Sequence, residues 1–395
     1  MQTNRLRKLL DSVLGLLLMQ TLALYGRVRR IFSARYRTDL ADMRVSSILV
    51  IKLCCPGDGV LALPAIRALK RAYPEASLTV ICTPRNLDAF TGHDFVDHLV
   101  SLQLTGLGGI GELLRQGPAA LREALRAVRR CHPDLAVDLD LYYKATPVLA
   151  FLSGAPIRAG FDTAGKARGY LYTHSAPREP EKHEVLCFLD ILAALGLHTD
   201  DLSLSLPHDD QAAASAARLL TARDMQANQP YAVIAPGSSR NWPVKRWTPE
   251  GFAAVAAHLR HAHDLPTVLI GAAFEASLGQ SIADAVGDGA VSLVGATTVR
   301  ETIELLREAA VVVSNDSGPM HLAAAVGVPV VAIFGPTNPV KWRPWTDRAE
   351  VVTAPECSCA PCYYLSAMPN CDGHGCLGQI SVSSVTDAVD RLLGS

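Results

Sequence analysis

The sequence shows no excess of charge of either sign. Its 395 residues include 37 lysines and arginines against 38 aspartates and glutamates, which gives a formal net charge of −1. Proteins that bind nucleic acid usually carry a basic bias, because they must neutralise phosphates. The charge balance therefore gives no support for a nucleic-acid partner.

The first 44 residues lack the pattern of a spanning helix and of a signal peptide. Their uncharged run, 12–26, has 15 residues, whereas a transmembrane helix needs about 20. Nine basic residues against three acidic ones surround it, and the basic flank after the run argues against cleavage. We interpret 1–44 as a leader whose helix lies on an anionic membrane surface. A helix that packs on the protein and a true span are the alternatives.

The ten cysteines do not form the pattern of a secreted disulfide framework. Five of them are scattered through expected core elements, where a free thiol packs as a small apolar group. The other five lie within residues 357–376. This usage favours a reducing cytoplasm. The scattered five are Cys54, Cys55, Cys82, Cys131 and Cys187.

Two nucleotide-binding motifs are missing or misplaced. No G-x-x-x-x-G-K-[ST] occurs, which excludes a P-loop. Residues 106–111 match G-x-G-x-x-G, but they follow the third expected strand, and no acidic residue ends a strand about 20 residues later. We interpret these residues as a flexible loop.

Length and periodicity predict two α/β domains. An apolar content of 49% over 395 residues suits two cores better than one. Short apolar runs alternate with amphipathic stretches, as in βαβ units with parallel sheets. The expected domains are 45–208 and 209–395. The expected strands are 48–53, 78–82, 95–102, 135–138, 231–235, 267–271, 291–294, 311–314 and 328–334, and the expected helices include 61–73 and 121–130.

The first expected strand runs into Pro56-Gly57-Asp58-Gly59. Ligands of open α/β sheets bind beyond the carboxyl ends of the strands, and Asp58 stands at such an end between two glycines. A helix N-terminus also favours an aspartate, because its free N–H groups and dipole stabilise negative charge. Asp58 therefore fits either a helix cap or a catalytic carboxylate.

Two junctions in the second half carry groups that bind anions. Residues 235–252 place the hydroxyls of Ser238 and Ser239 and the ammonium of Lys245 ahead of a helix, which suits a phosphate; a surface loop with routine capping is the alternative. Residues 311–339 place 315–318, Asn-Asp-Ser-Gly, at a strand end with a proline as first helical residue. His321, one turn later, fits either donor contact or core packing.

Four segments together resemble glycosyltransferase family 9, the bacterial ADP-heptose:lipopolysaccharide heptosyltransferases. The resemblance runs from about Ser46 to the C-terminus. It implies the GT-B architecture, in which two Rossmann-like domains with parallel sheets face each other across a cleft. The N-terminal domain would bind the acceptor and the C-terminal domain the nucleotide sugar. The segments are ILVIKLCCPGDGVLALPAIRALKRAYP, DLAVDLDLYYKA followed by RAGF, APGSSRNWPVKRWTPEGF, and VVSNDSGPMHLAAAVGVPVVAIFGPTNP.

The resemblance implies a role for each candidate residue. Asp58 would be the general base that deprotonates the acceptor hydroxyl, and Gly57 and Gly59 would let the sugar approach it. Lys52 would steady this carboxylate or an acidic acceptor. The remaining candidates would hold the donor: Ser238, Ser239 and Lys245 at its phosphates, Glu275 near its ribose, and Asp316, Ser317, Gly318 and His321 at its sugar and diphosphate.

The reaction implied is an inverting transfer of a heptose, or a related sugar, from an ADP-sugar such as ADP-heptose. The acceptor would be a lipid-linked saccharide of the lipopolysaccharide core, or a similar glycan, at the cytoplasmic face of the inner membrane. No cofactor and no metal is implied, because lysine and helix N-termini would neutralise the leaving group. A nucleotide-sugar-binding paralogue without turnover and a hydrolysing epimerase of the same architecture are the alternatives.

Two features need separate interpretation. Cys54-Cys55-Pro56 stands where the family commonly has small polar residues before Gly-Asp. The cysteine-rich tail has the close spacing of zinc ligands, and a packed cluster of reduced thiols is the other interpretation. The tail residues concerned are Cys357, Cys359, Cys362, Cys371, His374 and Cys376.

Overall fold

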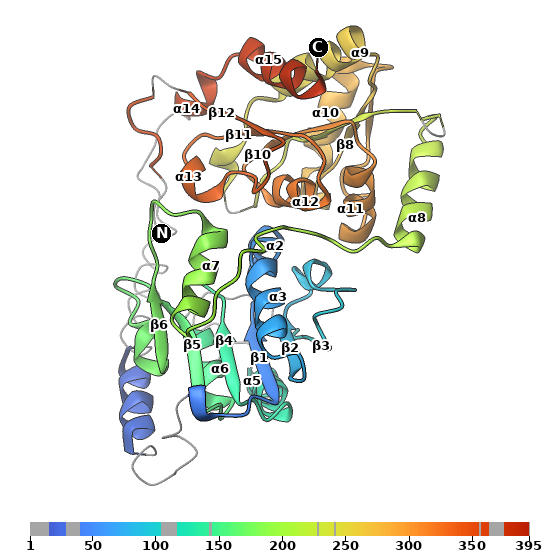
Figure 1. Ribbon diagram of the computed structural model, residues 1–395. Coiled ribbons are helices and arrows are strands. Elements are labelled where there is room, and N and C mark those ends of the chain that lie inside the picture. The colour runs from blue at the N-terminus through green and yellow to red at the C-terminus, as the bar shows by residue number, and fades with distance from the viewer. Residues whose placement is uncertain are drawn as a thin grey trace. The chain divides into compact units, whose positions relative to one another are not determined.

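The computed structural model describes residues 16–28, 40–103, 117–141, 144–226, 229–240, 242–354, 357–362 and 375–394. The chain divides into two compact units, Met1–Leu202 and Ser203–Ser395. Figure 1 shows each unit as a sheet flanked by helices. We expected the boundary after residue 208, in the extended segment that precedes α8 (Asp210–Thr221).

Unit 1 contains a six-stranded sheet of order β3-β2-β1-β4-β5-β6. All neighbouring strands are parallel. The strands are β1 (Ser47–Ile51), β2 (Ser77–Cys82), β3 (His98–Ser101), β4 (Leu135–Asp138), β5 (Ile157–Asp162) and β6 (His174–Pro177). The longer helices are α3 (Leu63–Ala72), α5 (Gly117–Arg130), α6 (Ala145–Leu152) and α7 (Glu184–Ala193).

Unit 2 repeats this arrangement with a parallel sheet of order β12-β11-β10-β7-β8-β9. Its strands are β7 (Ala232–Ala235), β8 (Thr267–Leu269), β9 (Ala290–Ser292), β10 (Val311–Asn315), β11 (Val330–Ile333) and β12 (Ala349–Val352). Its longer helices are α8, α9 (Pro249–His263), α10 (Ala276–Val286), α11 (Val299–Arg307), α12 (Gly318–Val326) and α15 (Val382–Leu393). The α/β class with two parallel sheets is thus as the periodicity predicts.

The helix after β1 differs from the expectation. It begins at Pro56, five residues early, as α2 (Pro56–Leu61), and α3 follows it after a break at Ala62. Pro64 has no N–H to donate, so a single continuous helix loses a hydrogen bond there. Asp58 consequently lies in the first turn of α2, and not in a loop ahead of the helix.

The strand order reverses direction once in each sheet. In unit 1 the chain leaves β1 toward β2 and returns to β4 on its other side; in unit 2 it leaves β7 toward β8 and returns to β10. The two connections that diverge at such a point leave a crevice at the carboxyl ends of the strands, where ligands of doubly wound sheets bind. The loops after β1 and β4, and after β7 and β10, are therefore the places to search for a site.

Within the leader the structure describes a helix over 16–28 and, after a gap, residues 40–44. Met19 is fully buried, and Tyr25 meets the ring of Phe151 edge to face, with centroids 6.4 Å apart. The helix therefore packs on unit 1 through one side. Another side exposes large apolar side chains, namely Leu17, Leu18, Leu24, Tyr25 and Val28. Among the residues placed by the structure, no helix combines the length and the apolar character that crossing a bilayer requires.

Candidate active site

Three charged side chains meet at the switch point of unit 1. Lys52 directly follows β1, and its Nζ lies 3.1 Å from Asp140 Oδ1 and 4.0 Å from Asp58 Oδ2. The side chains of Lys52 and Asp140 are fully buried, whereas 20% of the Asp58 side chain is exposed. Of these three groups, only the Asp58 carboxylate can therefore reach a ligand.

Asp140 fixes the loop that follows β1. Besides Lys52, its carboxylate accepts hydrogen bonds from the backbone N–H of Leu53 at 2.8 Å and of Cys54 at 3.3 Å. A buried charge is tolerated when it is paired and hydrogen-bonded in this way. Sequence reasoning missed Asp140. Its position just beyond the carboxyl end of β4, the strand beside β1, is the signal that could have found it.

Asn86 braces the same loop from the other side. Its Nδ2 donates to the carbonyl oxygens of Lys52 at 2.8 Å and Cys54 at 3.3 Å, while its Oδ1 accepts from the N–H of Thr83. Asn86 is buried. The backbone on which Lys52 stands is thus held on both sides, and sequence reasoning missed this residue too.

Burial and charge together tune the groups at this switch point. Burial raises the pKa of Asp58 to about 6, with Lys52 opposing the rise and the carboxylates of Glu184 and Asp140 adding to it. Burial by itself lowers the pKa of Lys52, but Asp140 and Asp58 outweigh it, so its pKa is raised and the ammonium stays charged. A carboxylate with a pKa near 6 is a stronger base than an ordinary aspartate and is still ionised at neutral pH.

A second buried ion pair contributes to this electrostatic environment. Arg178 donates from Nη2 to Glu184 Oε2 at 2.8 Å and from Nε to Oε1 at 3.2 Å. Such a two-bond contact holds both groups in a fixed geometry. Both charges act on the pKa of Asp58, and neither residue was identified from the sequence.

The two glycines beside Asp58 are buried in α2. A Cβ at Gly59 would lie 3.2 Å from Ala89 Cβ and from Phe90 Cζ, so close packing against η3 (Leu87–Ala89) already favours glycine there. The acceptor contact expected of Gly57 and Gly59 stays a prediction.

At the switch point of unit 2, Lys245 pairs with Asp316. The Lys245 Nζ atom lies 2.7 Å from Asp316 Oδ2, and 19% of the lysine side chain is exposed against 7% of the aspartate. Burial by itself raises the pKa of Asp316, but Lys245 outweighs it and holds the pKa below its ordinary value. The structure thus brings together two candidates that are about seventy residues apart in the sequence.

Asn315, the last residue of β10, ties the two loops of this switch point together. Its Nδ2 donates to the carbonyl of Pro236 at 2.8 Å, and its Oδ1 accepts from the backbone N–H of Trp247 at 3.0 Å. The loop after β7 is therefore fixed at both ends by a side chain of the neighbouring strand.

Glu275 stabilises the loop that follows β7 through hydrogen bonds. Its carboxylate accepts hydrogen bonds from the N–H of Ser238 at 2.8 Å, the N–H of Ala272 at 3.0 Å and Arg246 Nη2 at 3.3 Å. A Cβ at Gly237 would overlap the same carboxylate, so any side chain at this position would displace Glu275 from its hydrogen bonds. The ribose contact expected of Glu275 stays a prediction.

The serines of the loop after β7 lie in different environments. Ser238 is buried; its hydroxyl donates to the carbonyl of Trp242 at 2.9 Å and accepts from Arg246 Nε at 3.2 Å. Ser239 is exposed. The guanidiniums of Arg240 and Arg246 lie over the ring of Phe274, which adds positive charge that sequence reasoning did not use.

The N-terminus of α12 is open. Ser317 is the N-cap residue, but its side chain accepts no capping hydrogen bond. A Cβ at Gly318 would meet nothing within 4 Å. The first N–H groups of a helix favour an anion, and Asp316, which pairs with Lys245, lies just ahead of this helix. His321, in the same helix, is buried.

The comparison with known proteins decides the family. Residues 121–369, more than half of the chain, match the model of glycosyltransferase family 9 (heptosyltransferase). The chain belongs to this family. The match does not extend to Lys52 and Asp58, so their assignment rests on the geometry and on the motif around them.

Individual relatives agree with this glycosyltransferase assignment. A lipooligosaccharide heptosyltransferase 2 of Haemophilus influenzae is 34% identical over 128 residues, which are 31% of this chain and 36% of that protein. A lipopolysaccharide heptosyltransferase 2 of Salmonella typhimurium is 26% identical over 320 residues, covering 77% of this chain and 87% of the relative. The solved structure of an ADP-heptose LPS heptosyltransferase II from Escherichia coli superimposes with a TM-score of 0.68 at 21% identity, covering 88% and 98% of the two chains. The expected GT-B fold class is confirmed.

The cysteines of this glycosyltransferase add two observations. Cys54 Sγ and Cys55 Sγ lie 2.7 Å apart ahead of α2, and Cys357 Sγ lies 3.3 Å from Cys359 Sγ. Among the cysteines that the structure describes, no disulfide is formed. Zinc binding by the tail is not tested, because Cys371 and His374 lie outside the described residues, as do 106–111.

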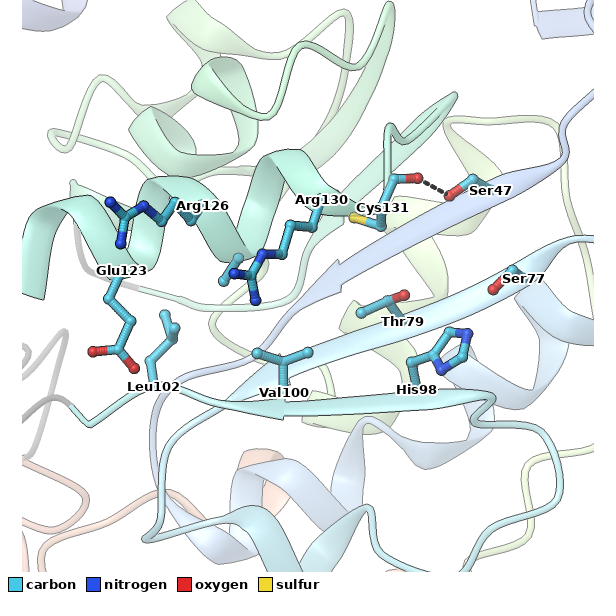
Figure 2. Close-up of a pocket in the computed structure, with 11 residues that line it drawn as sticks. Ser47, Ser77, Thr79, His98, Val100, Leu102, Glu123, Arg126, Arg130 and Cys131 are labelled. Carbon is cyan, nitrogen blue, oxygen red and sulfur yellow. Dashed lines mark hydrogen bonds between the residues drawn. The ribbon is translucent and has the colours of Figure 1, made fainter.

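A pocket of about 530 Å³ lies elsewhere in unit 1. Figure 2 shows it between α5, which carries Arg126 and Arg130, and the sheet, which carries Val100 and His98. The lining includes residues at both ends of β3, from His98 to Leu102, so the pocket lies along one face of the sheet. None of the residues predicted for the site lines it.

Proposed function

We propose that this glycosyltransferase moves a heptose from ADP-heptose to a saccharide of the lipopolysaccharide core, with inversion at the transferred carbon and with Asp58 as the general base. The observation that carries the proposal is the Asp58 carboxylate, partly exposed at the switch point of unit 1 with a pKa of about 6. The donor and the acceptor are inferred from the names of the relatives.

The proposed step is a single displacement. The acceptor hydroxyl gives its proton to the Asp58 carboxylate, and its oxygen attacks the anomeric carbon from the side opposite to the diphosphate. The bond from that carbon to the diphosphate oxygen breaks, and ADP leaves with both electrons. Lys52 lies 4.0 Å from Asp58 and favours the ionised, proton-accepting form of the base.

Unit 2 supplies the donor contacts in this proposal. Lys245 and the first N–H groups of α12 present positive charge to the diphosphate, whose negative charge grows as the bond breaks. The exposed hydroxyl of Ser239 adds a donor, while Glu275 and Asn315 hold the loop that presents these groups. His321 and Ser317 are proposed to contact the sugar and the diphosphate.

The leader is proposed to place the enzyme at the cytoplasmic face of the inner membrane. The helix over 16–28 already packs on unit 1, and its exposed Leu17, Leu24 and Tyr25 offer apolar area beyond that contact. Apolar side chains that insert into an interface, together with neighbouring arginines on anionic headgroups, hold a helix at a membrane surface.

The test measures ADP release from ADP-heptose with and without a lipid A–core acceptor. Acceptor-dependent release, abolished by Asp58→Asn and unchanged by Asp200→Asn at an exposed position of unit 1, supports the proposal. Release that does not depend on the acceptor indicates a hydrolysing epimerase. Tight binding of ADP-heptose without release under either condition indicates a binding paralogue.

A further inference from the structure

Two imidazoles and one carboxylate converge on the surface of unit 2. His258 and His263 lie in the last two turns of α9, and Asp390 lies in the last turn of α15. His258 Nε2 is 2.8 Å and His263 Nε2 is 2.7 Å from the same oxygen, Asp390 Oδ1. The two rings meet edge to face with centroids 5.6 Å apart. None of these groups belongs to the proposed active site.

The cluster lies at the edge of the sheet opposite to the donor loops. Helix α9 begins after the loop that follows β7, with Thr248 as its N-cap, and ends at His263 ahead of β8. In a parallel sheet such a helix returns the chain from the carboxyl edge to the amino edge. Figure 1 shows α9 and α15 together on the outside of unit 2.

The local charge favours a cation. The C-terminal end of a helix carries a partial negative charge, and the ends of α9 and α15 meet here around an additional carboxylate. The nearest arginines have other partners, because Arg260 pairs with Asp264 and Arg391 pairs with Glu350.

We propose that His258, His263 and Asp390 bind a divalent first-row transition-metal ion. Two neutral imidazoles and a carboxylate are a ligand set that such ions, zinc among them, prefer. The three ligand atoms lie within 4.8 Å of one another, so small side-chain rotations bring each of them to about 2.0–2.2 Å from a shared ion. The ion takes the place of the proton on each Nε2, and each neutral ring then carries its single proton on Nδ1.

A metal ion bound at this site connects helices α9 and α15. Helix α15 buries Val385, Ala388 and Val389 in the core of unit 2, and the carbonyl of Ile380 just before it accepts a hydrogen bond from the indole of Trp247. An ion that binds only the folded state stabilises that state. The site therefore stabilises the packing of α15 on α9 without taking part in sugar transfer, and the inference does not rest on the proposed function.

The test uses the full chain, stripped by a chelator and kept reduced, with zinc alone as the titrant. We expect the His258→Gln/His263→Gln variant to bind one equivalent of zinc fewer than the unsubstituted protein and to lose the zinc-induced rise in Tm. His261→Gln is the matched control, because His261 is exposed on the same helix and outside the cluster. Asp390→Asn keeps the size of the side chain and should lose the same equivalent.

Thiols elsewhere in the chain can also bind zinc. The number of zinc equivalents bound per chain is therefore compared between variants. Cobalt(II) separates the two kinds of site, because thiolates give an intense near-ultraviolet charge-transfer band that imidazole and carboxylate ligands do not. The inference is overturned if Asp390→Asn and the double histidine variant bind as many equivalents of zinc as the control, with equal affinity. If the double variant does not fold, Asp390→Asn alone decides.

Discussion

Replacing Asp58 with asparagine should lower the transfer rate and raise the stability of unit 1 at the same time. A general base contributes roughly 10²–10⁴-fold to the rate, so we expect a loss in this range. Folding raises the pKa of Asp58 from 3.8 to about 6, which means that the folded state holds the proton more tightly than the unfolded chain. Keeping this carboxylate ionised at pH 7 therefore costs about 3 kcal/mol, and asparagine removes that cost.

The sign of the pH dependence follows from the same shift. Stability contributed by the protonated Asp58 is present below pH 4 and is lost as the pH rises toward 6. Activity runs the other way, because only the ionised form accepts a proton. With a pKa of about 6, the ionised fraction and hence the rate should fall about tenfold from pH 7 to pH 5. An aspartate of ordinary pKa would lose almost nothing over this range.

Two assays measure the effect of Asp58→Asn on the transfer rate and on stability separately. ADP release is measured from pH 5 to pH 8, and urea unfolding is followed by circular dichroism and by tryptophan fluorescence. All four tryptophans lie after residue 202, so fluorescence reports unit 2 and serves as the internal control. Retention of more than about a tenth of the rate in Asp58→Asn, or a variant less stable than its parent at pH 7, would show that Asp58 is only a helix cap and refute the reasoning.

Three further changes test other parts of the site. Lys245→Ala should weaken ADP binding by about 1.5–3 kcal/mol through loss of a charge-assisted contact; unchanged ADP affinity in calorimetry removes Lys245 from the site. Gly318→Leu fills open space at the start of α12, so ADP affinity should fall about tenfold or more as one such contact is lost, with Tm unchanged; equal affinity argues against a phosphate there. Leu17→Glu/Leu24→Glu should reduce co-flotation with anionic vesicles but leave transfer to a delipidated acceptor intact. Gln20→Glu, at an exposed position, adds charge without removing apolar area, and equal flotation of both variants contradicts the membrane proposal.

The central strands could be predicted because they are buried on both faces. Strands β1, β4, β7 and β10 consist of fully or largely buried residues, and such strands read as continuous apolar runs. Strands β6 and β12 lie at sheet edges and have one buried residue each, so no apolar run marks them. Strand β5 was missed as well, although it is an interior and mostly buried strand, because Arg158 and Gly160 interrupt its apolar residues. Helix α2 was missed because Pro56, Gly57 and Gly59 resemble a turn, although proline suits the first position of a helix.

The sequence marks the candidate residues that are proposed to contact the substrates, but it does not mark the residues that hold them in place. Asp58 lies between two glycines after an expected strand, and Asp316 follows another expected strand two residues before a glycine, which marks both in the sequence. Asp140, Asn86 and Asn315 act by holding a loop that belongs to another strand. Their partners are tens of residues away, and only the order of strands in the sheet brings them together.

The buried pair of Lys52 and Asp140 has a consequence for any exchange of the segment that carries the proposed base. Asp140 and Asn86 hold residues 52–54 in place. The segment that carries Asp58 therefore depends on side chains outside it and cannot be exchanged alone without losing these hydrogen bonds. Grafting residues 52–61 from another member of the family brings a new surface but leaves the supporting side chains of the host beneath it. A chimera that exchanges the segment together with positions 86 and 140 keeps the hydrogen bonds that support residues 52–54, and the close packing of Gly59 adds positions 89 and 90 to the exchange.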